Sequence, residues 1–343
     1  MTERPSTDGR ERRRGRALLV FLLLVAGATA PVGAYLKFGL EVDGRSVTIR
    51  WSVTPVRYYV NDRGVPGVTP SQLTDTFARA FATWQAVPTA SIAYEFGGVT
   101  AARPFEDDGR STLGFLAAPE LERVLATTSL LIDEVTGEVL ESDVFFNSAF
   151  QWSVAPGGEP GRFDLESIAV HEVGHLSGLG HSAIGETELV GSGRRVIAAE
   201  SVMFPLAYPD GRVAGRVLRA DDVAGISDLY PDGNFRAETG SLSGRVTRQG
   251  TGVFGAHVLA FHVATGAMVA TFSLTADGEF AIAGLRPGPH VVRVEPLDDA
   301  DLESFFEPDT PTDVDFRASF LDRLVVVPRG GDAGAVEIGV VPK

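Results

Sequence analysis

The sequence of 343 residues contains no cysteine. No disulfide can therefore cross-link the fold, and no thiolate is present to bind a metal ion. The missing cysteines do not indicate a compartment, so any inference about location has to come from another part of the sequence.

Histidine is scarce as well, with six residues, and none of them precedes His171. A structural zinc site normally draws its four ligands from Cys and His, with some carboxylates. The first 170 residues offer only carboxylates, which prefer hard cations such as calcium. These carboxylates allow calcium binding, but no calcium-binding loop motif in the sequence identifies a site.

Positive charge is in deficit, with 30 basic against 45 acidic residues, yet five arginines cluster near the N-terminus. They directly precede the apolar run 17–30, and Val32-Gly33-Ala34 fits a cleavage site. This layout predicts a secretory signal peptide over residues 1–34. The alternative is a retained membrane anchor, but the strongly apolar stretch is shorter than the roughly 20 residues that span a bilayer.

Removal of residues 1–34 takes away six Arg and three acidic residues, which leaves 24 basic and 42 acidic residues and a net charge of −18. So acidic a protein is not expected to bind nucleic acid. The signal peptide predicts a secreted, extracellular or cell-surface protein. A membrane is an expected partner only if the N-terminal segment is retained.

The length allows two domains of ordinary size, and 44% hydrophobic with 22% charged residues is typical of globular proteins. Pro231-Asp232-Gly233 marks a boundary between them. We therefore expect a signal peptide at 1–34, a first domain at 35–233 and a second domain at 234–343.

The first domain mixes strand and helix patterns, which predicts an α+β fold. Helices are expected after Thr69, where Gln72 completes a capping box, after Asp164, and over residues 221–229. Strands are expected at 47–51, 56–60 and 91–96, and a hairpin at 128–133 and 138–147.

The second domain has a different sequence pattern. Short apolar runs at 256–262, 270–274, 280–282 and 291–294 are separated by Gly, Asp and Pro, and no helical period is present. This pattern predicts a small all-β sandwich.

One segment of eleven residues carries a chemical signal: His171-Glu172-Val-Gly-His175-Leu-Ser-Gly178-Leu-Gly-His181. Residues four apart share a helix face, so His171 and His175 can reach one ion. Gly178 lets the helix end, and the turn brings His181 round as a third ligand. Three ligands leave the fourth position of a tetrahedral Zn²⁺ open, as in catalytic sites.

Glu172 lies beside these ligands and can reach a water on the metal, which suits it to act as a general base and acid. The structural alternative is a helix with surface histidines. It is disfavoured because half of the six His fall in this one short segment.

The segment resembles the zinc motif of the metzincins, and Ser182 is typical of their matrixin branch. Residues 201–205 match the family's Met-turn, with Met203 as the methionine, and residues 219–230 resemble its closing helix. The resemblance covers about residues 45–232 and is to matrixin-like metalloproteases of the bacterial type. It implies a twisted mixed β-sheet with an active-site helix and a small C-terminal subdomain.

The resemblance also implies a function. The protein is expected to be a zinc-dependent endopeptidase with one catalytic Zn²⁺ and a protein or peptide substrate. In this family the substrate lies extended along an edge strand, which we place within residues 138–147. Pro205 and Tyr208 are expected to line the substrate pocket, and Met203 to form a packing floor.

The spacing between His181 and Met203 departs from the family pattern. Residues 183–199 form an insertion between His181 and Met203, which we expect to be a mobile loop that tunes substrate choice. The region 234–343 resembles carboxypeptidase regulatory-like domains. Its expected role is that of a spacer or of an attachment site for a cell-surface or matrix ligand, with His257, His262 and His290 as ordinary polar positions.

Two other functions stay open at this point. The chain could be a binding or adhesion protein that uses a protease-like fold without turnover, although a degenerate site usually loses a ligand or the glutamate. It could also be a structural surface protein whose function lies in the second domain.

The ligand inventory predicts one tightly bound zinc per chain, because three His in the first domain suffice for a catalytic site and leave none for a structural one. Elemental analysis of the folded, dialysed protein checks this. A second stoichiometric zinc that persists when His171 and His175 are both replaced would contradict it.

Overall fold

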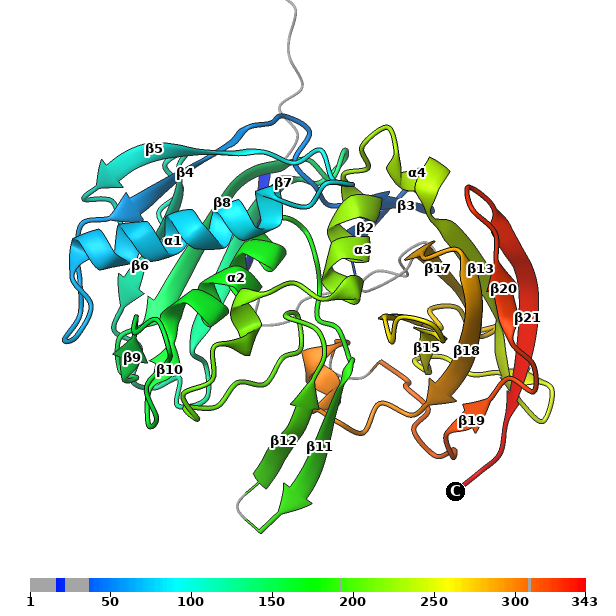
Figure 1. Ribbon diagram of the computed structural model, residues 1–343. Coiled ribbons are helices and arrows are strands. Elements are labelled where there is room, and N and C mark those ends of the chain that lie inside the picture. The colour runs from blue at the N-terminus through cyan, green and yellow to red at the C-terminus, as the bar shows by residue number, and fades with distance from the viewer. Residues whose placement is uncertain (1–16, 22–36, 192, 308–309) are drawn as a thin grey trace, which may run out of the picture.

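The computed structural model describes residues 17–21, 37–191, 193–307 and 310–343. These form an N-terminal part of mixed sheet and helices and a C-terminal β region beside it (Figure 1). Most of the predicted signal peptide lies outside the described residues. Within the described part of the chain, no helix is both long and apolar enough to cross a bilayer.

A six-stranded mixed sheet forms the N-terminal part, with the strand order β1-β7-β8-β6-β4-β5. Strands β4, β5, β6 and β8 run parallel to one another, whereas β7 is antiparallel to both β8 and β1. The bounds are β1 Ala17–Phe21, β4 Val56–Asn61, β5 Tyr94–Thr100, β6 Ser111–Leu116, β7 Ala126–Asp133 and β8 Val139–Asn147.

The predicted hairpin is present as β7 and β8, but the prediction of β8 as the edge strand is wrong. β8 lies between β7 and β6. Strand β6 has no clear pattern in the sequence, and it pairs parallel with β8. Both edges of β8 are therefore hydrogen-bonded, one to β6 and the other to β7. The strand next to the cleft is β7.

Two helices pack together on this sheet. Helix α1 (Pro70–Gln85) begins with the predicted capping box of Thr69 and Gln72, and α2 (Leu165–Leu176) is capped by Asp164. The indole Nε1 of Trp84 donates to the carbonyl of Val170 at 2.7 Å and joins the two helices. Helix α2 is thereby held against the sheet over most of its length.

Shorter elements complete the N-terminal part. They are β2 Gly39–Val42, β3 Arg45–Thr48, β9 Trp152–Ser153, β10 Phe163–Asp164, the 3₁₀ turn η1 Ala214–Arg216, α3 Ala220–Leu229 and α4 Phe235–Glu238. The start of the N-terminal part is tied to α3 by an ion pair of 2.5 Å between Lys37 and Asp228.

The predicted loop over residues 183–199 is a β-hairpin. Strands β11 (Gly185–Val190) and β12 (Gly193–Ala199) pair antiparallel and project away from the body of the protein (Figure 1). The β-branched residues Thr187, Val190, Val196 and Ile197 of the insertion favour strands over an irregular loop. Its mobility stays a prediction.

Two sheets form the C-terminal β region, as the sequence pattern predicts. The first contains β14-β13-β17 with β21 also on β13, and the second contains β16-β15-β18-β19 with β20 also on β18. Buried residues from both sheets make one shared apolar core. The bounds are β13 Gly240–Arg248, β14 Thr251–Gly252, β15 His257–His262, β16 Met268–Phe272, β17 Glu279–Leu285, β18 Gly288–Glu295, β19 Ser319–Phe320, β20 Val325–Val327 and β21 Asp332–Val340, with a 3₁₀ turn η2 at Leu302–Ser304.

One carboxyl group in the sheet organises the chain before β6. Asp143 of β8 is buried and accepts hydrogen bonds from the backbone N–H groups of Phe105 (2.5 Å) and Thr112 (2.6 Å). Burial raises the pKa of Asp143 to about 7, and the nearby Glu141 and Asp108 add to the increase. The folded protein therefore holds a proton on this group at pH values where the unfolded chain has lost it.

Because the pKa of Asp143 is higher in the folded state, its contribution to stability is present below about pH 4 and is lost as the pH rises through about 7. Between pH 4 and pH 8, the free energy of unfolding of the wild type should fall by about 2–4 kcal/mol relative to Asp143→Asn. Urea unfolding of both proteins across this range measures the difference. Parallel pH curves would contradict the assignment.

Candidate metal centre

Helix α2 and the turn after it bring the three predicted histidines together. His171 and His175 lie on one face of α2, and the helix ends where Gly178 adopts φ +100°. A side chain at this glycine would lie 2.6 Å from the carbonyl oxygen of Ile49. The glycine thus permits both the left-handed turn and the close approach that returns His181 to the helix.

The ligand atoms of His171, His175 and His181 all lie within 4.8 Å of one another. The Nε2 atoms of His175 and His181 are 3.2 Å apart. Among the residues that the structure describes, no other group of three or more His, Cys, Asp or Glu gathers in this way. The triad is therefore the candidate metal centre.

Each histidine is oriented by a carbonyl oxygen that faces its Nδ1 atom. These oxygens belong to Val202 (2.8 Å from His171), Leu179 (2.7 Å from His175) and Ser304 (2.6 Å from His181). A carbonyl can only accept, so each Nδ1 carries the proton and each Nε2 is left with a free lone pair. Three such lone pairs facing one point fit a zinc ion.

The surroundings also keep the three rings neutral. Withdrawal from water lowers the pKa of all three, that of His175 well below its ordinary value and that of His181 to about 3. The rings further lower one another's pKa, because two imidazolium ions cannot lie this close without strong repulsion. Neutral imidazole is the form that binds a metal ion.

Glu172 lies on the same helix, facing β7. Its Oε2 accepts a hydrogen bond of 2.6 Å from the hydroxyl of Thr128, and its carboxyl lines the same cleft as the three histidines. Burial raises the pKa of Glu172 to about 7, while the Thr128 hydrogen bond opposes the increase. The group can therefore exchange a proton near neutral pH.

Met203 lies directly under α2. A side chain on Gly174, in the middle of the motif, would lie 2.3 Å from the sulfur of Met203. The turn that carries Met203 is held by Asp222 of α3, whose carboxylate accepts from the Ser201 hydroxyl (2.6 Å) and from the Val202 backbone N–H (3.0 Å). Since the carbonyl of Val202 faces His171, Asp222 supports the first histidine through this turn.

The cleft at the metal centre has a volume of about 460 Å³. Pro205 and Tyr208 line it, together with residues 124–128, which lead into β7. Most of the other lining side chains are apolar, including Phe150, Phe163, Ile168 and Leu206, but Lys37, Glu122 and Arg123 also line the cleft. The site therefore combines three metal-binding nitrogens, a protonatable carboxyl and an apolar cleft with room for a side chain.

The family model described as Matrixin matches residues 50–231, which is more than half of the chain. This chain belongs to the matrixin family. The match spans strands β4 to β8 of the sheet, both central helices, the Met203 turn and α3, and the histidine triad is typical of the catalytic zinc site of matrixins.

Curated relatives agree with the family model. Metalloendoproteinase 1-MMP of Arabidopsis thaliana is 28% identical over 198 residues, which cover 54% of this chain and 45% of that protein. Metalloendoproteinase 1 of Glycine max is 32% identical over 178 residues, which cover 46% and 47%. Matrix metalloproteinase-20 of Homo sapiens is 30% identical over 139 residues, which cover 40% and 21%. The chain thus spans less than half the length of these relatives.

Several residues of the matrixin site have no signal in the sequence alone. Thr128 and Ser304 contact Glu172 and His181 from 44 and 123 residues away, and Asp222 contacts the backbone of Val202 in the Met203 turn from 20 residues away. Asp222 also caps the start of α3, since its carboxylate accepts from the backbone N–H of Arg219. Its role at the Met203 turn depends on where that turn lies in space.

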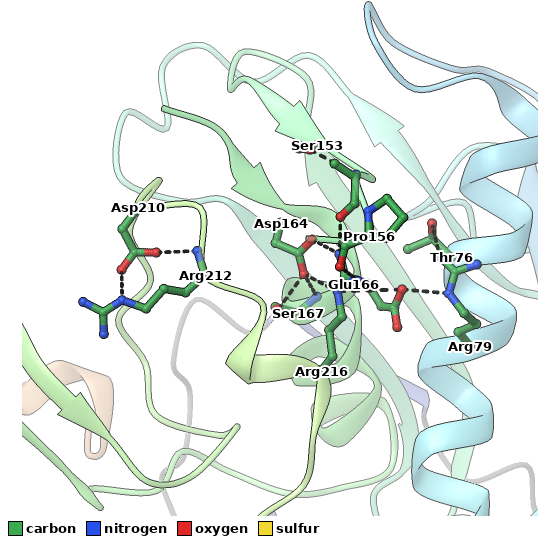
Figure 2. A network of polar contacts seen from close by, with 11 residues as sticks. Thr76, Arg79, Ser153, Pro156, Asp164, Glu166, Ser167, Asp210, Arg212 and Arg216 are labelled. Carbon is green, nitrogen blue, oxygen red and sulfur yellow. Dashed lines mark hydrogen bonds and ion pairs between the residues drawn. The ribbon is translucent and has the colours of Figure 1, made fainter. Parts of the chain in front are cut away.

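A further support joins the start of α2 to the segment after the Met203 turn (Figure 2). Arg216 of η1 donates to both carboxylate oxygens of Asp164, at 2.9 and 2.5 Å, and to the carbonyls of Ala155 and Pro156. Asp164 in turn caps α2 through the backbone N–H of Ser167 at 2.9 Å. The arginine therefore fixes the helix start and the wall of the cleft relative to each other.

Replacement of Arg216 by Ala should lower the free energy of unfolding by about 2 kcal/mol, because it leaves the buried carboxylate of Asp164 with fewer donors. Arg212 provides a matched control, since its ion pair with Asp210 in the same region is exposed (Figure 2). Arg212→Ala should change the free energy by less than about 0.5 kcal/mol. Equal effects in denaturant unfolding would show that the Arg216 network adds no stability.

Proposed function

We propose that this chain is a zinc-dependent endopeptidase that hydrolyses peptide bonds of proteins outside the cytoplasm. The observation that carries the proposal is the convergence of three free Nε2 lone pairs and the carboxyl of Glu172 in one apolar cleft. The printed names of its relatives, metalloendoproteinases, agree with this activity.

His171, His175 and His181 would hold the ion through their Nε2 atoms. A bound zinc supplies a Lewis acid that polarises a carbonyl group and lowers the pKa of water. The chain contributes the fixed orientation of the ligands, because the Nδ1 atom of each ring donates to a carbonyl oxygen. It also contributes a low-polarity site in which the rings stay neutral.

Glu172 is the general base and general acid of the proposed mechanism. Thr128 holds Oε2, and the other carboxylate oxygen, Oε1, takes the proton of the attacking water. The same proton is then delivered to the nitrogen of the departing amine. A pKa of about 7 suits both steps, because the group must be able to gain and to lose the proton at the working pH.

The substrate backbone lies extended along residues 124–128. This segment lines the cleft, and β1, which falls within the proposed signal peptide, pairs with β7 only outside it, from Ser129 to Asp133. Pro205 and Tyr208 form the pocket for the side chain after the scissile bond, and Met203 packs beneath the site without taking part in the reaction. The apolar lining of the cleft favours an apolar side chain at this position.

In this proposal the chain comprises a signal peptide at 1–34, a catalytic domain at 35–233 of the bacterial matrixin type, and a β-sandwich at 234–343 similar to carboxypeptidase regulatory-like domains. The mature protein is secreted or displayed at the cell surface. A surface or matrix ligand could bind the second domain.

A binding protein without turnover is the competing function. It would be expected to lose a ligand or the glutamate, whereas this chain retains all four side chains in one cleft. Digestion of casein or gelatin by the purified protein separates the two: proteolysis supports the enzyme, and tight binding without cleavage supports the competitor.

The variant Glu172→Ala should bind zinc normally and lose peptide hydrolysis by about 10²–10⁴-fold, since it removes the proton carrier and keeps the three ligands. Peptide turnover and metal content are measured on the same preparation. Near-normal turnover in the zinc-loaded variant would rule out this role for Glu172. Chelation should inactivate the wild type, and zinc should restore its activity.

A further inference from the structure

The third histidine is oriented by the C-terminal β region. The Nδ1 atoms of His171 and His175 face carbonyl oxygens of the N-terminal part, whereas that of His181 faces the carbonyl oxygen of Ser304 at 2.6 Å. These two residues are 123 positions apart in the chain. The second domain thus contacts the metal centre itself.

The same segment forms part of the cleft. Ser304 and Phe305 line it together with the three histidines, and the rings of Phe305 and His181 lie 6.5 Å apart. We name residues 297–306 the cleft loop. It contains η2, drawn in orange near β11 and β12 in Figure 1.

Apolar packing holds the cleft loop against β16. Phe305 and Phe306 are buried against Phe272 of β16, with ring centroids 5.6 Å apart in each case. The same cluster includes Ala183, two residues after His181, and Leu206 of the cleft wall packs against it. The cluster therefore joins the loop to the chain on either side of the metal centre.

Polar contacts hold the cleft loop from the side of the hairpin. Arg194 of β12 donates to the carbonyl of Asp298 at 2.6 Å and to that of Ala300 at 3.4 Å. The backbone N–H of Thr187 donates to the carboxylate of Asp299 at 2.6 Å. The hairpin of β11 and β12 therefore supports the cleft loop and also lies beside the cleft.

The interface between α3 and the C-terminal β region is tightly packed. Asp221 of α3 is buried and accepts from the Ser182 hydroxyl at 2.6 Å and from the backbone N–H of Ala270 in β16 at 2.9 Å. A side chain on Gly284 of β17 would lie 2.7 Å from the Cβ of Ala224 in α3. Contacts this close, with a shared buried carboxyl, are those of a fixed interface rather than a tethered domain.

We propose that the cleft loop of the C-terminal β region is part of the catalytic centre, where Ser304 positions His181 and Phe305 limits the cleft. The carbonyl of Ser304 selects the tautomer of His181 that offers Nε2 to the metal, and such outer contacts tune metal affinity. Phe305 bounds the space open to a substrate side chain. This inference rests on the proposed function.

The first experiment compares Phe305→Ala with Phe316→Ala in the full chain. Both side chains are buried in the same region, but Phe316 belongs to the core between the two sheets. Phe305→Ala should weaken zinc binding by about tenfold in chelator competition and shift the visible spectrum of the cobalt-substituted protein. Phe316→Ala should lower thermal stability and leave both readouts unchanged, and Phe305→Leu should restore them in large part.

The second experiment uses a side chain whose removal leaves the cores intact. Arg194→Ala removes the hydrogen bonds from the hairpin to the carbonyls of Asp298 and Ala300 and keeps the contact between Thr187 and Asp299, so it loosens the cleft loop. Its control is Arg248→Ala, which removes a comparable contact between Arg248 and the carbonyl of Asp315, away from the cleft. In a cleavage profile of a peptide library, Arg194→Ala should change relative preferences by about tenfold and admit larger side chains, while Arg248→Ala should match the wild type.

The inference is overturned if Arg194→Ala keeps the wild-type cleavage profile and any folded Phe305→Ala keeps the wild-type zinc affinity and cobalt spectrum. It is overturned equally if the two control variants shift these readouts as much. Failure of the wild type to cleave any peptide would instead refute the proposed function. The zinc and cobalt measurements would still test the positioning of His181.

Discussion

The remaining structure depends on one constraint. Three neutral imidazole rings must direct their Nε2 atoms toward the same position. Each ring needs an acceptor for its Nδ1 proton, because only then does Nε2 present a lone pair to a cation. The acceptors are the carbonyls of Val202, Leu179 and Ser304, from three separate segments. The Met203 turn, the end of α2 and the cleft loop must all be in place for one metal centre to form.

Buried carboxyl groups of α3 connect these segments. Asp222 holds the turn that supplies the Val202 carbonyl, and its neighbour Asp221 joins Ser182 to strand β16. Withdrawal from water raises the pKa of both groups, so they are costly to ionise in the fold. Each carboxyl group accepts hydrogen bonds from donors in different parts of the chain, which offset this cost. One short helix thereby aligns the histidine motif, the Met203 turn and the C-terminal β region.

The accuracy of the sequence-based predictions varied with the range of the interactions. The capping box at Thr69, the cap at Asp164 and the hairpin at 128–147 depend on neighbouring residues, and the structure contains all three. The assignment of β8 as the edge strand was wrong, because strand order depends on the weakly patterned β6. The insertion at 183–199 was expected to be a loop, although its strands pair with each other.

The sequence alone determined the metal-binding residues, since a helical spacing of four and a glycine turn bring His171, His175 and His181 to one side of a helix. It also determined the family and the β-rich character of the last hundred residues. Only the tertiary structure decided what holds these ligands. The partners of Glu172, Met203 and His181 are the side chains of Thr128 and Asp222 and the main-chain carbonyl of Ser304, groups that resemble many others in the chain. Their roles follow from through-space proximity, which no local pattern encodes.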